Sequence, residues 1–144
     1  MKNRYLLLFF GLCCALQACV AQGPQKPPED LLSLTDAQLK IRSFQTRTFD
    51  AQDSNAVLRA VAAALQDLGF IIERANAPMG LVTAGKFAGE GFTGFVEVTV
   101  MVRSTDTKQT EVRVNALFNT KPIEDPKVYQ NFFTSVERAL FVAR

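Results

Sequence analysis

Two runs of alternating apolar and polar residues constrain the fold most. In residues 95–103, "FVEVTVMVR", valine occupies every second position, and in residues 110–118, "TEVRVNALF", the alternation resumes. Successive side chains of a strand point to opposite faces, so each run predicts a strand with one apolar face. The inward residues of the second run are expected to be Val112, Val114, Ala116 and Phe118. The short polar segment "STDTKQ" between the runs indicates an antiparallel hairpin, whose apolar face needs a covering layer.

A helix over residues 54–68 can supply part of that layer. Its apolar residues recur every three or four positions, as one buried helix face requires. They are Val57, Ala60, Val61, Ala64, Leu65 and Leu68. Asp53 or Ser54 can accept a hydrogen bond from the free N–H groups of the first turn. Gly69 follows where glycine commonly ends a helix.

A second helix is predicted in "EDPKVYQNFFTSVERALFVAR", residues 124–144. Asp125 can cap it, and Pro126 suits the first helical position because its missing N–H would have no partner there. The apolar face consists of Tyr129, Phe132, Phe133, Val136 and Leu140. This helical spacing favours a core helix over an aromatic ligand site.

Three shorter segments have the composition of strands. They are residues 45–50, 70–74 and 81–87. The sequence thus predicts an α+β fold of order β-α-β-β-β-β-α, with a mainly antiparallel sheet of about five strands and two helices packed on one face. Before the first strand, residues 31–44 are expected to form a single helical turn or an irregular lead-in, because Thr35 resembles a helix cap.

The N-terminus has the three parts of a secretory signal. "MKNR" carries two positive charges, "YLLLFFGLCCAL" is almost wholly apolar, and small and polar residues follow. This apolar run is shorter than the roughly 20 residues that a transmembrane helix needs. Residues 1–18 are therefore interpreted as a signal peptide, the alternative being a buried or membrane-anchoring N-terminal helix.

The cysteines support processing at residue 19. Cys13 and Cys14 lie within the apolar run, so cleavage after Ala18 would leave Cys19 alone. A lone cysteine cannot form an intramolecular disulfide, and an oxidising compartment would oxidise a free thiol or pair it with another chain. "LQAC" resembles the lipobox of bacterial lipoproteins, although a small or apolar residue is commoner at Gln17.

This resemblance implies that the sulfur of Cys19 receives a diacylglycerol and that its amine is acylated. Two or more chains give stable anchoring, since each buried methylene contributes roughly 0.8 kcal/mol. Val20 follows Cys19, whereas an Asp there retains lipoproteins of enteric bacteria in the inner membrane. The outer membrane, with the domain in the periplasm, is therefore favoured over the inner membrane or the cell surface. The alternative is an ordinary secreted protein.

Beyond the signal peptide, the chain is close to neutral and its composition indicates a tether followed by one domain. Two of the 16 basic residues, Lys2 and Arg4, fall in the signal, so the remaining 14 balance the 14 acidic residues. Because no basic cluster stands out, nucleic acid is not an expected partner. Residues 19–40 begin with a Pro-, Gly- and Gln-rich stretch and are expected to form a lipidated, flexible tether. Residues 41–144 would then form a single α+β domain.

The residue types argue against an enzyme. The chain has no His, and after lipidation it would have no free Cys, which excludes Ser-His-Asp catalysis and a cysteine nucleophile. The carboxylate pairs Glu124–Asp125 and Asp50–Asp53 lie at helix starts, where acids act as caps. No catalytic residue, cofactor or metal site is predicted, although carboxylates or Tyr129 are the residues an enzyme would have to use.

A glycine-rich loop, "AGEGFTG" at residues 88–94, lacks the Gly-Lys-Ser/Thr ending of a phosphate-binding loop. Phe87, Phe92 and Phe95 in and beside it would either bury in the fold or contact a partner or membrane. The outward sheet face is a second candidate surface. It mixes Phe95, Met101 and Leu117 with Glu97, Arg103, Glu111 and Arg113.

The segments "TRTFD", "VLRAVAAALQDLGF" and "EDPKVYQNFF" through "ALF" resemble a family of small proteobacterial lipoproteins. The element order is also similar to helix-grip domains, such as those of the lipoprotein C subunit of the Bam outer-membrane assembly machine. The anchor, the tether and the shortage of catalytic residue types favour a non-enzymatic accessory or binding module of an outer-membrane assembly or export complex, with an envelope protein as partner. The alternative is a periplasmic-facing carrier of a lipid or another small apolar ligand, held between sheet and helices.

Overall fold

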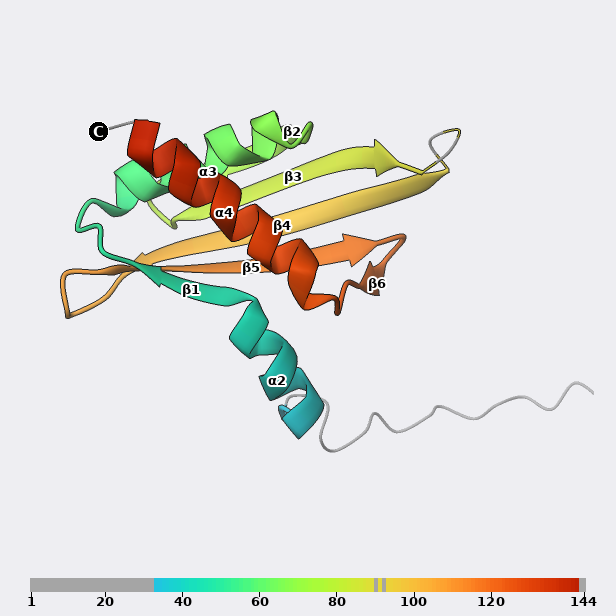
Figure 1. The fold of residues 1–144 in the computed structure, drawn as a ribbon, viewed down its shortest axis with the longest axis horizontal. Coiled ribbons are helices and arrows are strands. Elements are labelled where there is room, and N and C mark those ends of the chain that lie inside the picture. Colours follow the sequence, from blue (N-terminus) through green and yellow to red (C-terminus); the bar gives the residue numbers. More distant parts are fainter. Residues whose placement is uncertain (1–32, 90, 92, 143–144) are drawn as a thin grey trace, which may run out of the picture. The chain divides into compact units, whose positions relative to one another are not determined.

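The computed structural model describes residues 33–89, 91 and 93–142 (Figure 1). Its elements in chain order are α2 (Asp36–Phe44), β1 (Thr46–Phe49), α3 (Ser54–Asp67), β2 (Ile71–Asn76), β3 (Leu81–Ala88), β4 (Gly94–Ser104), β5 (Thr110–Phe118), β6 (Lys121–Pro122) and α4 (Pro126–Val142). None of the helices in these residues is both long and apolar enough to cross a membrane.

The strands form one antiparallel sheet in the order β1-β5-β4-β3-β2. β2 to β5 pair with their neighbours along the chain, whereas β1 lies at the opposite edge from β2 and pairs with β5. The two-residue β6 pairs with the end of β5, beyond the part that β1 covers. α3 and α4 share one core with the inward side chains of the sheet, so both pack on the same face (Figure 1). The predicted α+β fold is confirmed.

The alternating runs bury their valines as expected. In the β4–β5 hairpin, Val98, Val100, Val102, Val112 and Val114 are each at most 5% exposed and pack against the helices. Fully burying such a side chain contributes about 1.5–3 kcal/mol relative to leaving it exposed. At one end of the hairpin the pattern is less complete. Val96 is half-buried and its cross-strand partner Phe118 is 42% exposed, although both were expected to be inward.

Both long helices begin at the caps that the sequence predicts. The side chain of Asp53 accepts a hydrogen bond from the N–H of Asn55 at 2.9 Å, at the start of α3. The side chain of Asp125 accepts one from the N–H of Lys127 at 2.9 Å, just before α4. After α3, Gly69 adopts a φ of 80°, a left-handed conformation that glycine takes without steric cost.

α2 is longer than the single turn or irregular lead-in expected from the sequence. It has nine residues and starts with a capping box, in which Thr35 and Gln38 satisfy each other's backbone N–H groups. Arg42 in its last turn suits the negative end of the helix dipole. α2 packs against β1 and α4, and these tertiary contacts stabilise a helix that is short for isolation in water. It occupies the end of the stretch that was expected to be a tether.

Candidate binding surfaces

An apolar cleft of about 320 Å³ opens between the helices and the inward face of the sheet. In Figure 1, α3 and α4 lie close at one end and diverge toward the other, where the cleft is found. Leu65 and Leu68 line it from the C-terminal end of α3, and Val128 and Phe132 line it from the first turns of α4. Val96 and Phe118 are partly exposed because neither helix completely covers this end of the sheet.

The floor of the cleft comes from the sheet. Its residues are Val96, Val98, Val114 and Ala116. Ligand sites in proteins are typically concave, largely apolar and about 300–1,000 Å³ in volume. The volume of this cleft is at the small end of that range, so it suits a ligand with one hydrocarbon chain or one ring.

Lys86 supplies a positive charge to this largely apolar lining. Val82, Ala84 and Lys86 alternate along β3 and share its inward face, so the lysine occupies a position where the pattern predicts an apolar residue. Its Nζ donates a hydrogen bond to the backbone carbonyl of Leu68 at 3.0 Å and lies 4.4 Å from the centroid of the Phe70 ring. Lys86 therefore links the end of α3 to the sheet, with its ammonium group beside the cleft.

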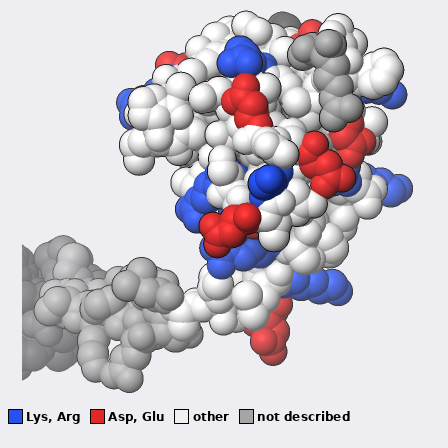
Figure 2. All heavy atoms as spheres, turned by 90° about the vertical axis from the view of Figure 1, so that its left-hand side faces the viewer, with Lys and Arg blue, Asp and Glu red and all other residues white. Residues whose placement is uncertain are grey.

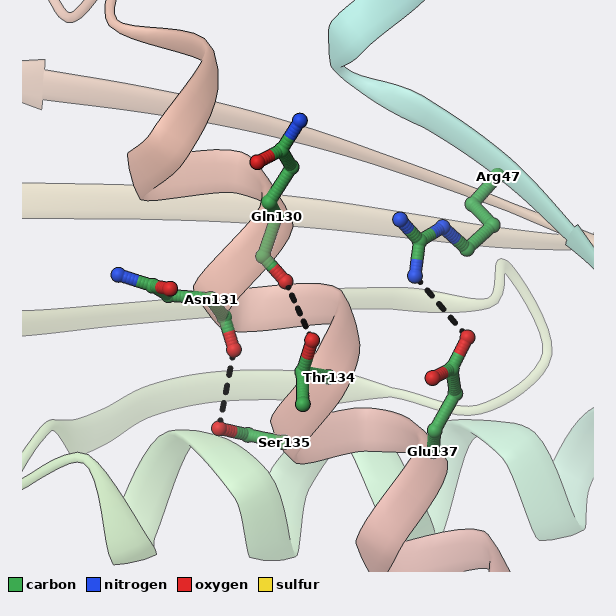
Figure 3. A network of polar contacts seen from close by, with 6 residues as sticks. All are labelled: Arg47, Gln130, Asn131, Thr134, Ser135 and Glu137. Carbon is green, nitrogen blue, oxygen red and sulfur yellow. Dashed lines mark hydrogen bonds and ion pairs between the residues drawn. The ribbon is translucent and has the colours of Figure 1, made fainter.

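Asn131 adds an amide on the helix side of the cleft. Figure 3 shows its side chain on the side of α4 away from Arg47. On the opposite side, Arg47 from β1 donates to Glu137 at 2.9 Å and lies 4.8 Å from the centroid of the Phe133 ring. These two contacts hold α4 against the β1 edge of the sheet.

The aromatic end of the sheet, which we define as Ile71, Phe87 and Phe95, lies on the outward face. Phe87 and Phe95 are directly opposite each other across β3 and β4, with ring centroids 5.2 Å apart in an edge-to-face arrangement. Phe87 is 65% exposed and Ile71 is 73% exposed. The sequence left open whether the phenylalanines are buried, and Phe87 proves to be largely exposed. Phe92 lies outside the described residues.

Gly85 leaves room for the Phe95 ring on the outward face of the sheet. A Cβ atom at this position would stand against that ring and within 2.7 Å of the Oε1 atom of Glu73. The aromatic end and the cleft lie on opposite faces of the same part of the sheet. Lys86 is next to Phe87 in β3 and Val96 is next to Phe95 in β4, and successive side chains of a strand point to opposite faces. Apolar surface is thus present on both faces of one end of the sheet.

Elsewhere on the outward face, charged and polar side chains are interspersed with the apolar Leu81, Met101 and Leu117. Met101 is covered by the guanidinium of Arg103, whose Nη2 lies 2.9 Å from the Met101 sulfur. Glu111 and Arg113 pair at 3.6 Å. Figure 2 shows acidic and basic side chains interspersed over the side of the molecule that it presents, without a large area of one sign.

Three of the four candidate acids, Asp50, Asp53 and Asp125, have structural partners. Asp53 caps α3 and lies 3.7 Å from Arg59, and Asp50 accepts a hydrogen bond from Gln109 at 2.6 Å. Tyr129 is 1% exposed, and its hydroxyl interacts with the carbonyl of Ile123 and with Gln45. These contacts give each group a role in stability. Cys19, the predicted lipidation site, lies outside the described residues.

The sequence named Phe87 and Phe95 as possible contact residues and offered a ligand between sheet and helices as an alternative, but it did not single out the residues that line the cleft. The inward position of Lys86 in "LVTAGKF" was the available signal, since a charge on the buried face of a strand needs an explanation. The chain matches no known family model. No curated protein is similar enough to be matched with it.

Proposed function

We propose that this chain is a lipid-anchored envelope protein whose domain is a non-enzymatic binding module. Cys19 would attach it to the outer membrane, and the domain in the periplasm would serve as an accessory part of an assembly or export complex. The observation that carries the binding role is the aromatic end, where Ile71 and Phe87 are 73% and 65% exposed beside Phe95. Exposed apolar clusters on soluble domains commonly mark interaction sites.

The chain offers a matched pair of variants for testing this role. Phe87→Ser removes the most exposed ring of the aromatic end, and Phe141→Ser removes a ring of similar exposure, 79%, near the C-terminal end of α4. Neither change creates a cavity in the core, so both variants should fold with stabilities within about 0.5 kcal/mol of the parent.

The experiment is crosslinking in native membranes followed by affinity purification of the full chain. We expect a stoichiometric envelope protein with the parent and with Phe141→Ser, and at least a tenfold weaker recovery with Phe87→Ser, because central aromatic residues at interfaces contribute about 2 kcal/mol or more. Failure to recover a stoichiometric partner under several solubilisation conditions would contradict the proposal. Equal recovery with both variants would contradict the assignment of the surface.

The second candidate function is a carrier of a small apolar ligand, and the cleft between α3, α4 and the sheet favours it. Val128 lines the cleft and is 41% exposed, so Val128→Phe can occupy the mouth without overpacking the core. Native mass spectrometry of the mature chain with dodecan-1-ol should detect a one-to-one adduct with the parent and little with Val128→Phe. A bare-chain mass at every concentration would exclude this candidate.

A further inference from the structure

We infer that the cleft selects a single-chain amphiphile with an anionic head, and that Lys86 is the residue that recognises the head. This inference rests on the cleft being a ligand site, as in the second candidate function. The class of ligand follows from three properties of the cleft, which are its lining, its charge and its size.

The lining of the cleft requires a ligand that is largely apolar. Leu65, Leu68 and Phe132 on the helix side face valine side chains and Ala116 from the sheet. A hydrocarbon chain placed there would remove apolar surface from water at about 25 cal/mol per Å². The volume of about 320 Å³ suits one such chain and is small for a lipid with two.

The charge of the cleft requires an anion. Lys86 is the one charged residue in the lining, and no Asp or Glu lines it within the described part of the chain. An ammonium group has three N–H donors. One of them is used by the carbonyl of Leu68, and among the described residues Lys86 forms no ion pair. Its remaining donors can bind the oxygens of a carboxylate or a phosphate.

The position of Lys86 orients such a ligand. The contact with the Phe70 ring at 4.4 Å and the bond to Leu68 hold the ammonium beside the C-terminal end of α3, at one side of the cleft. Asn131 also lines the cleft, from α4, and its amide is a further N–H donor there. The head would therefore stay at the mouth with the chain directed between the helices and the sheet.

The test uses the full mature chain in nanodiscs and photoreactive probes that differ in the head alone. The probes carry the same diazirine-bearing twelve-carbon chain with a carboxylate, a hydroxyl or a trimethylammonium head. The readout is the labelling of peptides that contain Leu65–Phe70 or Val128–Phe132, measured by mass spectrometry.

We expect the carboxylate to label these peptides at least about tenfold more strongly than the alcohol, because hydrogen bonds to charged groups contribute about 1.5–3 kcal/mol. Lys86→Met, which keeps an apolar stem, should remove this preference, and Lys86→Arg should retain it. Lys121→Met is the matched control, since Lys121 is an exposed lysine of β6 outside the cleft. It should leave the preference unchanged.

The three possible failures can be told apart. Equal labelling by the carboxylate and the alcohol in the parent would overturn the selection by Lys86 while leaving the cleft as an apolar site. A preference that survives Lys86→Met would overturn the role of Lys86. Labelling of the cleft peptides at background level by all three probes, and unchanged by Val128→Phe, would overturn the carrier function itself.

Discussion

The hydroxyl of Tyr129 in α4 donates a hydrogen bond to the backbone carbonyl of Ile123, six residues earlier in the chain. The same hydroxyl accepts a hydrogen bond from Gln45 Nε2 at 3.2 Å, and the N–H of Ile123 donates to Ala116 of β5 at 2.9 Å. A buried side chain thus joins the start of α4 to the edge of the sheet, between the parts of β5 that β1 and β6 cover.

Removing this hydroxyl should destabilise the domain without opening a cavity. Tyr129→Phe leaves the carbonyl of Ile123 and the amide of Gln45 without this partner, which should lower the free energy of unfolding by about 1–3 kcal/mol. Urea unfolding followed by circular dichroism measures the change as a lower midpoint at an unchanged slope.

The control is Thr134→Ala. The Thr134 hydroxyl is exposed and donates to the carbonyl of Gln130 within its own helix at 2.9 Å (Figure 3). Its loss should change stability by no more than about 0.5 kcal/mol. If the two variants unfold at the same urea concentration, the Tyr129 bond does not stabilise the fold as we describe.

Arg47 should contribute more to stability than its ion-pair partner. Arg47 and Glu137 side chains are 35% and 54% exposed, so their pairing should be worth about 0.2–1 kcal/mol. Arg47 also stacks on the Phe133 ring, whose packing Glu137→Ala would leave in place. We therefore expect Arg47→Ala to cost more than Glu137→Ala.

A double-mutant cycle over Arg47 and Glu137 separates the energy of their ion pair from that of the contact between Arg47 and the Phe133 ring. The coupling energy should decrease when the salt concentration is raised from about 0.1 M to 1 M, because the Debye length shortens from about 10 Å to 3 Å. The additional cost of Arg47→Ala should persist at high salt. Its disappearance there would show that the ring contact adds nothing.

Gly80 and Gly69 provide a comparison of backbone strain with and without steric conflict. Both have positive φ, 62° and 80° respectively. A Cβ at Gly69 would meet nothing within 4 Å, whereas one at Gly80 would stand against the backbone carbonyl of Val102. Gly69→Ala should cost about 1–2 kcal/mol from the left-handed conformation alone.

Gly80→Ala should cost clearly more, because the turn must move away from β4 and the 2.7 Å hydrogen bond from the N–H of Val102 to the carbonyl of Gly80 would be strained. Thermal unfolding of the two variants side by side measures the difference. Equal melting temperatures would contradict the close approach of this turn to β4.

Cys19→Ser tests the predicted membrane attachment. Without the thiol, the diacylglycerol cannot be added, so an unprocessed or soluble species should accumulate. Membrane fractionation combined with the intact mass of the chain measures both effects. A variant that still fractionates with the outer membrane at the mature mass would contradict the lipoprotein interpretation.

The sequence predicts those parts of the fold that depend on local periodicity. The alternation around Val100 and Val114 and the caps at Asp53 and Asp125 each involve a few neighbouring residues, and the structure confirms them. The pairing of β1 with β5 depends on residues far apart in the chain, which a local pattern does not encode.

The size and lining of the cleft could not be predicted for a related reason. Its size depends on the angle at which α3 and α4 diverge, and this angle is set by the whole core. The exposure of Phe87 could not be predicted either, because the alternation assigns the residue to one face of the sheet but does not tell whether another element covers that face. Lys86 alone carried a local signal, as a charge on the inward side of a strand.

The position of β1 at the far edge of the sheet has a consequence for the order of folding. Thr46 pairs with Arg113, 67 residues later in the chain, whereas β3, β4 and β5 each pair with the strand made just before them. Such distant pairing is typical of slow steps, because loop closure must precede the contacts that reward it. During synthesis, the first strand to emerge is therefore the last that can join the sheet, and the edge of β5 stays open to other strands until it does.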